Sequence, residues 1–323
     1  MYKDIKAVFF VAALGLMLGG CYAPSEKTVT TDYEETFSGV EEIVLEGKFL
    51  EVSYEGRENS TEVHLNGYVE APESSGLQIK YRKSGSKLIV EVVGDTEIIG
   101  WNFGNRFDGF ISLTGPENIK LDFQNGSGSI EVLNVVHEVI DLKVNSGSIK
   151  AMGIESNTIN LHASSGSITG EALTGKVLAE VNSGSVKLTE LEGDVRANAS
   201  SGSLKFENIQ GKVDAKVNSG NIRLSEVKEL GQLEASSGSI KAERSGLGPN
   251  SNFKANSGSV SIQTTSDLKA FNYDLSATSG SVRVGDQDSG KKLDIDNGAS
   301  ATVEGRVSSG SIKIIVEGSE SPE

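Results

Sequence analysis

The fold is decided by one segment near the middle of the chain, Ser183-Gly184-Ser185-Val186-Lys187-Leu188-Thr189-Glu190-Leu191-Glu192-Gly193-Asp194-Val195-Arg196-Ala197-Asn198-Ala199. Apolar and polar residues alternate after the Ser-Gly-Ser turn and again after Gly193, with the period of two expected of half-buried strands. Two strands and two turns therefore make one unit. Glycine at both corners, as also at Gly175 and Gly211, is expected where φ is positive or where stacked backbones approach closely.

The same turn returns through most of the chain. Its glycines lie mostly 18 or 19 residues apart, and the last steps are 20, 22 and 30 residues, at Gly128, Gly147, Gly166, Gly184, Gly202, Gly220, Gly238, Gly258, Gly280 and Gly310. A repeat this short, with strands on both sides of the turn, predicts a solenoid of stacked coils with about 18–20 residues each. We expect each turn to rest on the turn before it in the sequence.

Two arrangements of such strands are compatible with alternating residues and glycine turns. In an antiparallel meander successive turns lie at opposite ends of the sheet and need not share one sequence. Stacked coils place identical turns about 4.8 Å apart, where Asn and Ser side chains can form hydrogen-bonded ladders. We therefore predict an all-β fold, a parallel β-helix, and expect it to be right-handed from the usual preference of crossover connections.

A second regularity supports stacking. The residue pair before the turn alternates between a larger and a smaller apolar residue, in the order Val144-Asn145, Ala163-Ser164, Val181-Asn182, Ala199-Ser200, Val217-Asn218 and Ala235-Ser236. If these layers touch, a bulky coil packs against a small one and the interior keeps its normal density.

The flanking segments differ from the repeat. Residues 37–120 are rich in strand patterns but lack the regularly spaced turn, which predicts an N-terminal β cap or divergent early coils, because an open end exposes unpaired backbone groups. Residues 121–316 are the predicted β-helix repeat domain. The long last intervals predict a loop and a modified final coil ending at residues 312–316, followed by a tail at 317–323.

The N-terminal residues predict where the protein is located in the cell. Lys3 and Lys6 precede a short apolar run, and residues 1–20 are interpreted as a lipoprotein signal peptide because the run is too short for a permanent membrane span. Leu18-Gly19-Gly20-Cys21 resembles a lipobox, and Cys21, which is the single cysteine, is the predicted lipidation site. Residues 21–36 are expected to be a flexible tether. Tyr22 after the cysteine favours an outer-membrane location over retention at the inner membrane.

The chain resembles the putative-adhesin families of bacterial envelope proteins, including the auto-transporter-adhesin-like head GIN domain. The resemblance covers about residues 37–316 and is carried by Phe37-Ser38-Gly39-Val40-Glu41-Glu42-Ile43-Val44-Leu45-Glu46-Gly47 and by turns such as Asn125-Gly126-Ser127-Gly128-Ser129-Ile130. Serine, or Asn221, stands where an acidic residue often ends the turn in those families. The resemblance implies a β-helical, surface-located, non-enzymatic protein with an adhesive role.

One row of residues could bind a ligand. Seven of the ten residues three places after a turn glycine are basic, although the formal net charge is −15, namely Lys150, Lys187, Lys205, Arg223, Lys241, Arg283 and Lys313. The row could hold an anionic envelope polymer, acidic polysaccharide or anionic lipid headgroups. The alternative interpretation is a solvated face neutralised by Glu190, Glu207, Glu226 and Glu243.

A second candidate is the aromatic run from Trp101 and Phe103 to Phe110. Aromatic rings in a glycine-rich loop could stack on sugar rings. They could equally cover the end of the solenoid core, where a large apolar cap is needed.

Other functions are disfavoured. The acidic balance argues against nucleic-acid binding. We find no repeated acidic pair before the turns, no metal-ligand spacing among the three histidines and no phosphate-binding loop, so no metal or cofactor is predicted. We therefore predict a non-enzymatic envelope protein, bound to a membrane through its N-terminal lipid, whose partner is an anionic polysaccharide or another envelope protein. The alternative is a polysaccharide lyase or hydrolase built on a β-helix.

Overall fold

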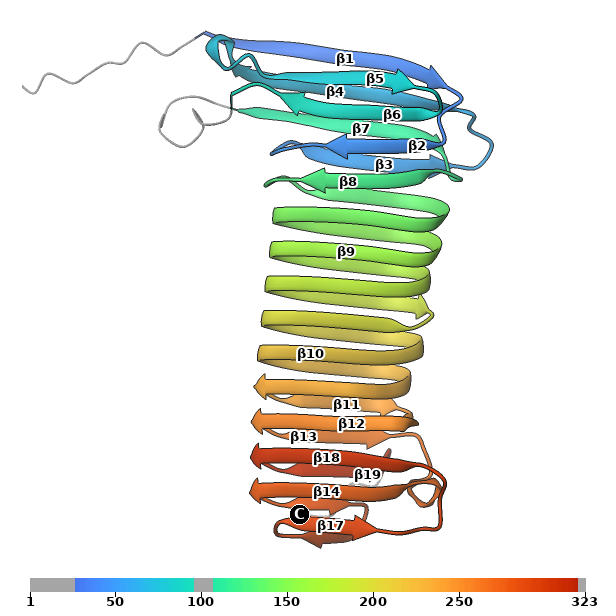
Figure 1. Ribbon diagram of the computed structural model, residues 1–323, viewed down its shortest axis with the longest axis vertical. Helices are drawn as coiled ribbons and strands as arrows, with labels where there is room; N and C mark the ends of the chain where they lie inside the picture. The colour runs from blue at the N-terminus through green and yellow to red at the C-terminus, as the bar shows by residue number, and fades with distance from the viewer. Residues whose placement is uncertain (1–26, 96–106, 319–323) are drawn as a thin grey trace, which may run out of the picture.

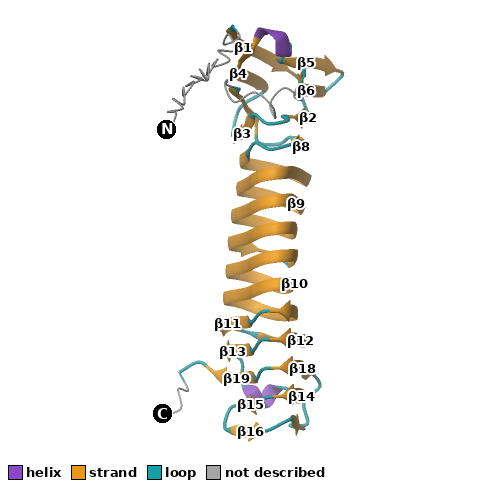
Figure 2. Cartoon of the chain, turned by 90° about the vertical axis from the view of Figure 1, so that its left-hand side faces the viewer, coloured by secondary structure: helices purple, strands orange, loops and turns teal. Residues whose placement is uncertain are grey.

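The computed structural model describes residues 27–95 and 107–318, which form a long stack of β-coils around one hydrophobic core (Figure 1). The central coils belong to two continuous strand segments, β9 (Ile130–Glu192) and β10 (Val195–Ser237). The predicted signal peptide, Cys21, Trp101 and Phe103 lie outside the described residues. Figure 2 shows the same stack from the side, with short helical turns only near its two ends.

Neighbouring coils pair in parallel, with equivalent residues in register. Where β10 follows β9, Gly202 lies opposite Gly184 and Phe206 lies opposite Leu188. This pairing confirms the all-β prediction and the parallel stacking of coils about 18 residues long. A meander would have paired these strands in the antiparallel sense.

The Ser-Gly turns require glycine for two reasons. Gly202 has φ of +134°, and a Cβ atom placed on it would overlap the carbonyl oxygen of Gly184 in the adjacent coil. The second corner is different, because several coils place a non-glycine residue in the left-handed region there, at Ala172, Glu190, Asn208, Glu226 and Arg244, and the first three stand three places before a glycine. Glycine at this corner, as at Gly175 and Gly193, was predictable from the sequence, whereas these left-handed residues were not.

Large buried side chains lie next to small ones, and together they fill the interior of the stack. Ala199 pairs with Val181, and both are buried. The coil that carries the small Ala197 and Ala199 on one strand carries the fully buried Phe206 on the other. The predicted layering of large and small residues is therefore present, and it keeps the core close-packed.

Serine and asparagine side chains connect the turns, as expected. Asn221 Oδ1 accepts a hydrogen bond of 2.9 Å from the backbone N–H of Ser239. Ser239 Oγ accepts from the N–H of Ser259 in the next coil, at 3.4 Å. The ladder continues from Ser259 to Ser311 and from Ser311 to Ser281.

The N-terminal end combines parallel coils with antiparallel hairpins. It contains β1 (Thr28–Ser38), β2 (Glu42–Glu46), β3 (Glu51–Arg57), β4 (Glu62–Pro72), the 3-10 turn η1 (Glu73–Ser75), β5 (Gln78–Ser84), β6 (Lys87–Val93), β7 (Asp108–Pro116) and β8 (Lys120–Asn125). The coil of β2 and β3 lies between the coil of β6 and β7 and the coil formed by β8 and the start of β9. This follows because β2 pairs with both β6 and β8, and β3 pairs with both β7 and β9. The outermost strands β1 and β5 are antiparallel to β4 and β6.

The C-terminal end repeats this arrangement. It contains β11 (Ile240–Ser245), β12 (Leu247–Ser257), β13 (Val260–Thr264), the 3-10 turn η3 (Leu268–Ala270), β14 (Asn272–Ser279), β15 (Val282–Val284), β16 (Gln287–Ser289), β17 (Lys292–Ile295), β18 (Thr302–Ser309) and β19 (Ile312–Val316). The last coil, β18 and β19, lies between the coils of β12–β13 and β14–β15 (Figure 1). The antiparallel strands β16 and β17 close the stack.

The expectation that each turn rests on the one before it is therefore wrong at this end. Gly310 lies between Gly258 and Gly280, because a Cβ on Gly310 would meet the Gly258 carbonyl and one on Gly280 would meet the Gly310 carbonyl. The physical reason is that the closing antiparallel strands β16 and β17 stand before β18 in the chain and occupy the end of the stack, so β18 and β19 lie at the remaining position next to β12 and β13.

The prediction of a flexible tether is wrong for its second half. Thr28–Ser38 forms strand β1, which pairs with the whole of β4, so the predicted tether from Thr28 to Thr36 belongs to the sheet. The segment contains many polar residues, but Tyr33 and Phe37 pack against the core and Tyr33 Oη accepts a hydrogen bond of 3.1 Å from the backbone N–H of Ile79. Two aromatic anchors and a full antiparallel ladder outweigh the polar composition.

Candidate functional site

The predicted basic residues lie on one face of the stack, which we call the basic face: the outward side chains of the strands that follow the Ser-Gly turns. Lys205 lies opposite Lys187, and Arg223 lies opposite Lys241. The step from Lys205 to Arg223 is one coil, since Gly220 rests on Gly202. Four adjacent coils therefore carry four basic side chains in one line.

The non-sequential coil order extends this line. Ser261 lies opposite Lys241 on one side and Lys313 on the other. Lys313 in turn lies opposite Arg283. The order along the stack is therefore Lys187, Lys205, Arg223, Lys241, Ser261, Lys313 and Arg283, which we call the basic row. Lys150 stands apart, because Thr169 occupies the coil between it and Lys187.

The ion pairs on the basic face leave the row positive. Lys205 and Lys241 pair with Glu207 and Glu243 of their own strands, at 3.3 and 2.5 Å. The hydrogen bond from Lys241 lowers the pKa of Glu243, so this carboxylate stays ionised. Lys150 pairs with Glu131 at 2.6 Å. Among the described residues, Lys187, Arg223 and Lys313 have no ion-pair partner, and all three are exposed.

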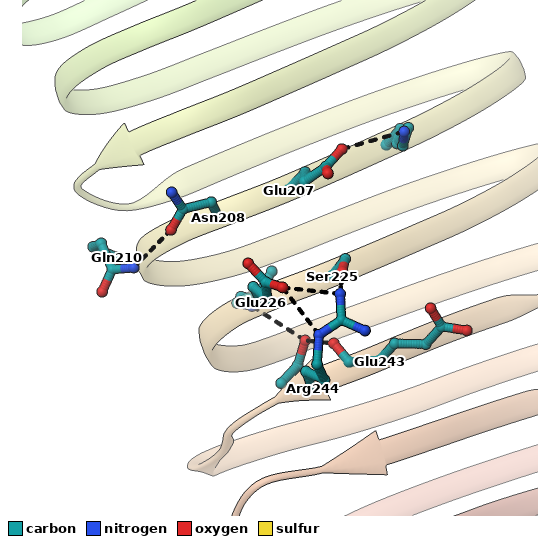
Figure 3. A network of polar contacts seen from close by, with 10 residues as sticks. Glu207, Asn208, Gln210, Ser225, Glu226, Glu243 and Arg244 are labelled. Carbon is teal, nitrogen blue, oxygen red and sulfur yellow. Dashed lines mark hydrogen bonds and ion pairs between the residues drawn. The ribbon is translucent and has the colours of Figure 1, made fainter. Parts of the chain in front are cut away.

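Glu207 and Glu243 each neutralise one lysine of their own strand. Among the described residues, Glu190 and Glu226 form no ion pair with the basic row. Glu226 instead binds Arg244, whose guanidinium donates to Glu226 at 3.0 Å and to Ser225 at 2.9 Å (Figure 3). Glu190 makes no ion pair within the described part of the chain. The contacts of Arg244 with Glu226 and Ser225 in Figure 3 therefore stabilise the second corner of the coils rather than the basic row.

The outward side chains of the strands that precede the turns form a second face, which we call the alternating face. There, opposite charges meet between neighbouring coils at several positions, although Lys254 lies opposite Arg306 and Asp274 lies opposite Glu304 near the C-terminal end. Arg196 pairs with Asp214 at 3.8 Å, Lys216 with Glu234 at 3.2 Å, and Arg306 with Asp274 at 3.0 Å. His162 lies 3.4 Å from Glu180 in the same way. No such complementarity holds between adjacent coils from Lys187 to Lys241 on the basic face.

The alternating face continues into the cap. Glu42 lies between Lys87 and Lys120 of the two flanking strands, and the carboxylate is 3.0 Å from each Nζ. Partial burial disfavours the charged carboxylate, but the hydrogen bonds from Lys120 and Lys87 outweigh it and hold the pKa of Glu42 below its ordinary value. This cluster stabilises the fold, because Lys87 and Lys120 each have the Glu42 carboxylate directly beside them.

The aromatic candidate can be described only in part. Phe107 packs at the edge of the core and makes an edge-to-face contact with Phe49, with ring centroids 6.1 Å apart. Phe110 makes a similar contact with Tyr68 at 5.1 Å on the outer surface. Phe107 therefore takes the expected role of covering the core, while Trp101 and Phe103 lie outside the described residues.

Other kinds of site are not evident in residues 27–95 and 107–318. Within these ranges no three or more His, Cys, Asp or Glu side chains gather so that they could hold a metal ion. The same residues include no helix of the length and apolarity needed to cross a membrane. The sequence pattern located the basic row, but it missed the contrast with the alternating face, which becomes visible in the sequence only when residues 18 places apart are compared strand by strand.

Comparison with known proteins gives a family model and several solved structures. The family model, Toastrack DUF4097, matches residues 40–315. No protein with a curated description matches the chain. A crystal structure of a putative adhesin from Bacteroides fragilis is similar, with 14% sequence identity, 90% of this chain and 99% of that chain covered, and a TM-score of 0.42. A putative adhesin from Parabacteroides merdae is 11% identical, with coverage of 90% and 96% and a TM-score of 0.42. A putative lipid binding protein from Parabacteroides distasonis is 15% identical, with coverage of 74% and 95% and a TM-score of 0.24.

Proposed function

The chain belongs to the Toastrack DUF4097 family, and we propose that it is a non-enzymatic, adhesin-like binding module of the bacterial cell envelope. The contact surface in this proposal is the basic row, and the ligand is an anionic polymer of the envelope. The module is held at the outer membrane through a lipid on Cys21, in keeping with the lipobox-like Leu18-Gly19-Gly20-Cys21.

The observation that carries this proposal is the stacking of like charges. Lys187, Lys205, Arg223 and Lys241 occupy adjacent coils about 4.8 Å apart, a spacing at which like charges directly opposite each other are destabilising. The alternating face of the same coils avoids this cost by pairing opposite charges. A row that lowers stability and yet spans four coils is best explained by a negatively charged ligand.

The winding of the coils does not alter the proposal. The right-handed sense expected from crossover preference stays a prediction. The order of the residues along the row depends only on strand pairing and is the same in either hand.

The proposal is tested by replacing Lys187, Lys205, Arg223 and Lys241 together with glutamate. We expect the variant to lose salt-sensitive retention on immobilised acidic polysaccharide while its thermal unfolding stays cooperative, because surface charges contribute little to the fold. The matched control reverses Lys143, Lys216 and Lys254 on the alternating face and should keep its retention. Equal retention of both variants would contradict the proposal.

A catalytic role is tested separately. Incubation of the protein with the same acidic polysaccharides should release no unsaturated, ultraviolet-absorbing product and no new reducing ends. Product formation that depends on the protein would favour a lyase or a hydrolase instead.

A further inference from the structure

We propose that the ligand of the basic row is a linear polyuronate, an acidic polysaccharide that lies along the axis of the stack and places one carboxylate on each coil. This inference rests on the proposed function and specifies its ligand. It follows from the spacing of the row, from the two columns of side chains beside it and from the acidic cap at its end.

The spacing selects an extended chain. Adjacent coils are about 4.8 Å apart, so the distance from Lys187 to Arg283 across six steps is about 29 Å. A compact anion would reach only one or two of these side chains. An extended polymer with one charge per short repeat reaches all of them. A uronic acid polymer has this property, because each sugar ring carries one carboxylate.

The first flanking column consists of turn residues two places before the basic row. It offers one small polar side chain per coil, in the stack order Ser185, Ser203, Asn221, Ser239, Ser259, Ser311 and Ser281. Where Ser239 and Ser259 accept a hydrogen bond from the backbone of the next coil, their own O–H groups remain able to donate. These groups can bind the hydroxyl and ring oxygens of a sugar chain.

The second flanking column lies two places after the row and includes Thr189, Glu207, Ser225, Glu243 and Gln263. Glu207 and Glu243 can accept hydrogen bonds from sugar hydroxyls. Their charge repels phosphates and carboxylates alike, but only a sugar chain has hydroxyl groups that donate to them and offset this repulsion. The cations of the row, the small polar side chain on each coil and the carboxylates on the coils of Lys205 and Lys241 together favour an acidic sugar chain over polyphosphate.

The cap limits the binding stretch at one end. The basic face continues onto β3, β7, β4 and β1, where the outward residues carry mostly negative charge, with Asp32, Glu34, Glu51, Glu55, Glu70 and Asp108. Lys150, the one basic residue of the row pattern nearest this cap, is already paired with Glu131. We therefore place the polymer on the seven coils from Lys187 to Arg283.

The test uses oligogalacturonates of two to eight sugars and the full chain in detergent, with binding measured by calorimetry at low salt. Affinity should rise with each added sugar up to about seven and then level off. Lys313→Glu should weaken binding of the seven-sugar chain by about fivefold and leave the four-sugar chain unchanged, since each surface charge pair is worth up to about 1 kcal/mol. Ser261→Lys, which fills the gap in the row, should strengthen binding of the seven-sugar chain by about threefold.

The controls separate this inference from the proposed function. Lys254→Glu on the alternating face should leave binding unchanged, and thermal unfolding checks that each variant is folded. Affinity that is independent of length, or unaffected by both Lys313→Glu and Ser261→Lys, would overturn the axial placement while retention on acidic polymer still stands. Equal binding of polyphosphate of matched length would overturn the choice of sugar chain. Loss of all binding to acidic polymers would overturn the proposed function as well.

Discussion

The two outer faces of the coil stack use charge in opposite ways. On the alternating face, the coils opposite the Lys187–Lys241 stretch and the cap present complementary partners, as in Lys216–Glu234 and Lys87–Glu42–Lys120. From Lys187 to Lys241 on the basic face, neighbouring coils present the same charge, and the acidic partners of Lys205 and Lys241 lie on the same strands as these lysines. The backbone of the two faces is the same repeated coil, so the difference lies in the choice of side chains.

This difference separates stability from function. Complementary pairs between coils hold the stack together, and they explain the alternating face without any ligand. Like charges between coils weaken the stack, and natural proteins commonly keep such unfavourable arrangements where activity needs them. The following predictions test whether this division of roles is real.

The largest effect is expected at the corner that joins the two faces. Gly202→Val should lower the free energy of unfolding by about 3 kcal/mol or more, because φ of +134° is unfavourable for valine and its Cβ would overlap the Gly184 carbonyl. Chemical denaturation measures the change. Gly290→Ala, where a Cβ has no neighbour within 4 Å, is the control and should be nearly neutral. An unchanged midpoint for Gly202→Val would show that the stacked corner is not needed.

An intermediate effect is expected on the alternating face. Glu42→Gln should lower the free energy of unfolding by about 1 kcal/mol at neutral pH, because both lysines lose their anion. The pKa of Glu42 is lowered in the folded state, so its contribution is present above the ordinary glutamate pKa and is lost as pH falls through the lowered value. Denaturation at a series of pH values should therefore show the two proteins converging in acid. A constant difference at every pH would contradict an electrostatic role for Glu42.

The smallest effect, and the one of opposite sign, is expected on the basic face. Arg223→Glu should raise the free energy of unfolding by about 0.5 kcal/mol, because the new carboxylate lies between Lys205 and Lys241. The same change should weaken binding of acidic polysaccharide. Asp214→Lys on the alternating face is the matched reversal and should be destabilising, since Arg196 and Lys212 already contact Asp214. Destabilisation by Arg223→Glu would remove the argument that the row is kept for binding.

The repeat itself was predictable because it depends on local rules. Alternating residues on each side of Gly184 and Gly202 define the strands, and the Val181 and Ala199 layers show which coils touch. The basic row follows from counting three residues after each glycine. These features repeat in the sequence at the same period as in space, so no long-range information was needed.

The order of the end coils was not predictable from the same rules. The turns at Gly258, Gly280 and Gly310 have nearly the same sequence, so any of them could stack on any other. The order is set by the hairpins between residues 285 and 301, which occupy the last position of the stack. Strand β1 was missed for a related reason, because its pairing with β4 depends on residues 24 to 44 places away.

The coil of β2 and β3 and the coil of β18 and β19 each lie between two other coils, and this has a consequence for biosynthesis. Residues 42–57 emerge from the ribosome early, but their two flanking coils are complete only when the chain has been made as far as the start of β9. At the other end, residues 302–316 are synthesised after both flanking coils, β12–β13 and β14–β15, and fill the slot between them. A chain cut short before residue 302 would leave that slot open and expose the edges of four strands, a form that chaperones and proteases can distinguish from the finished protein.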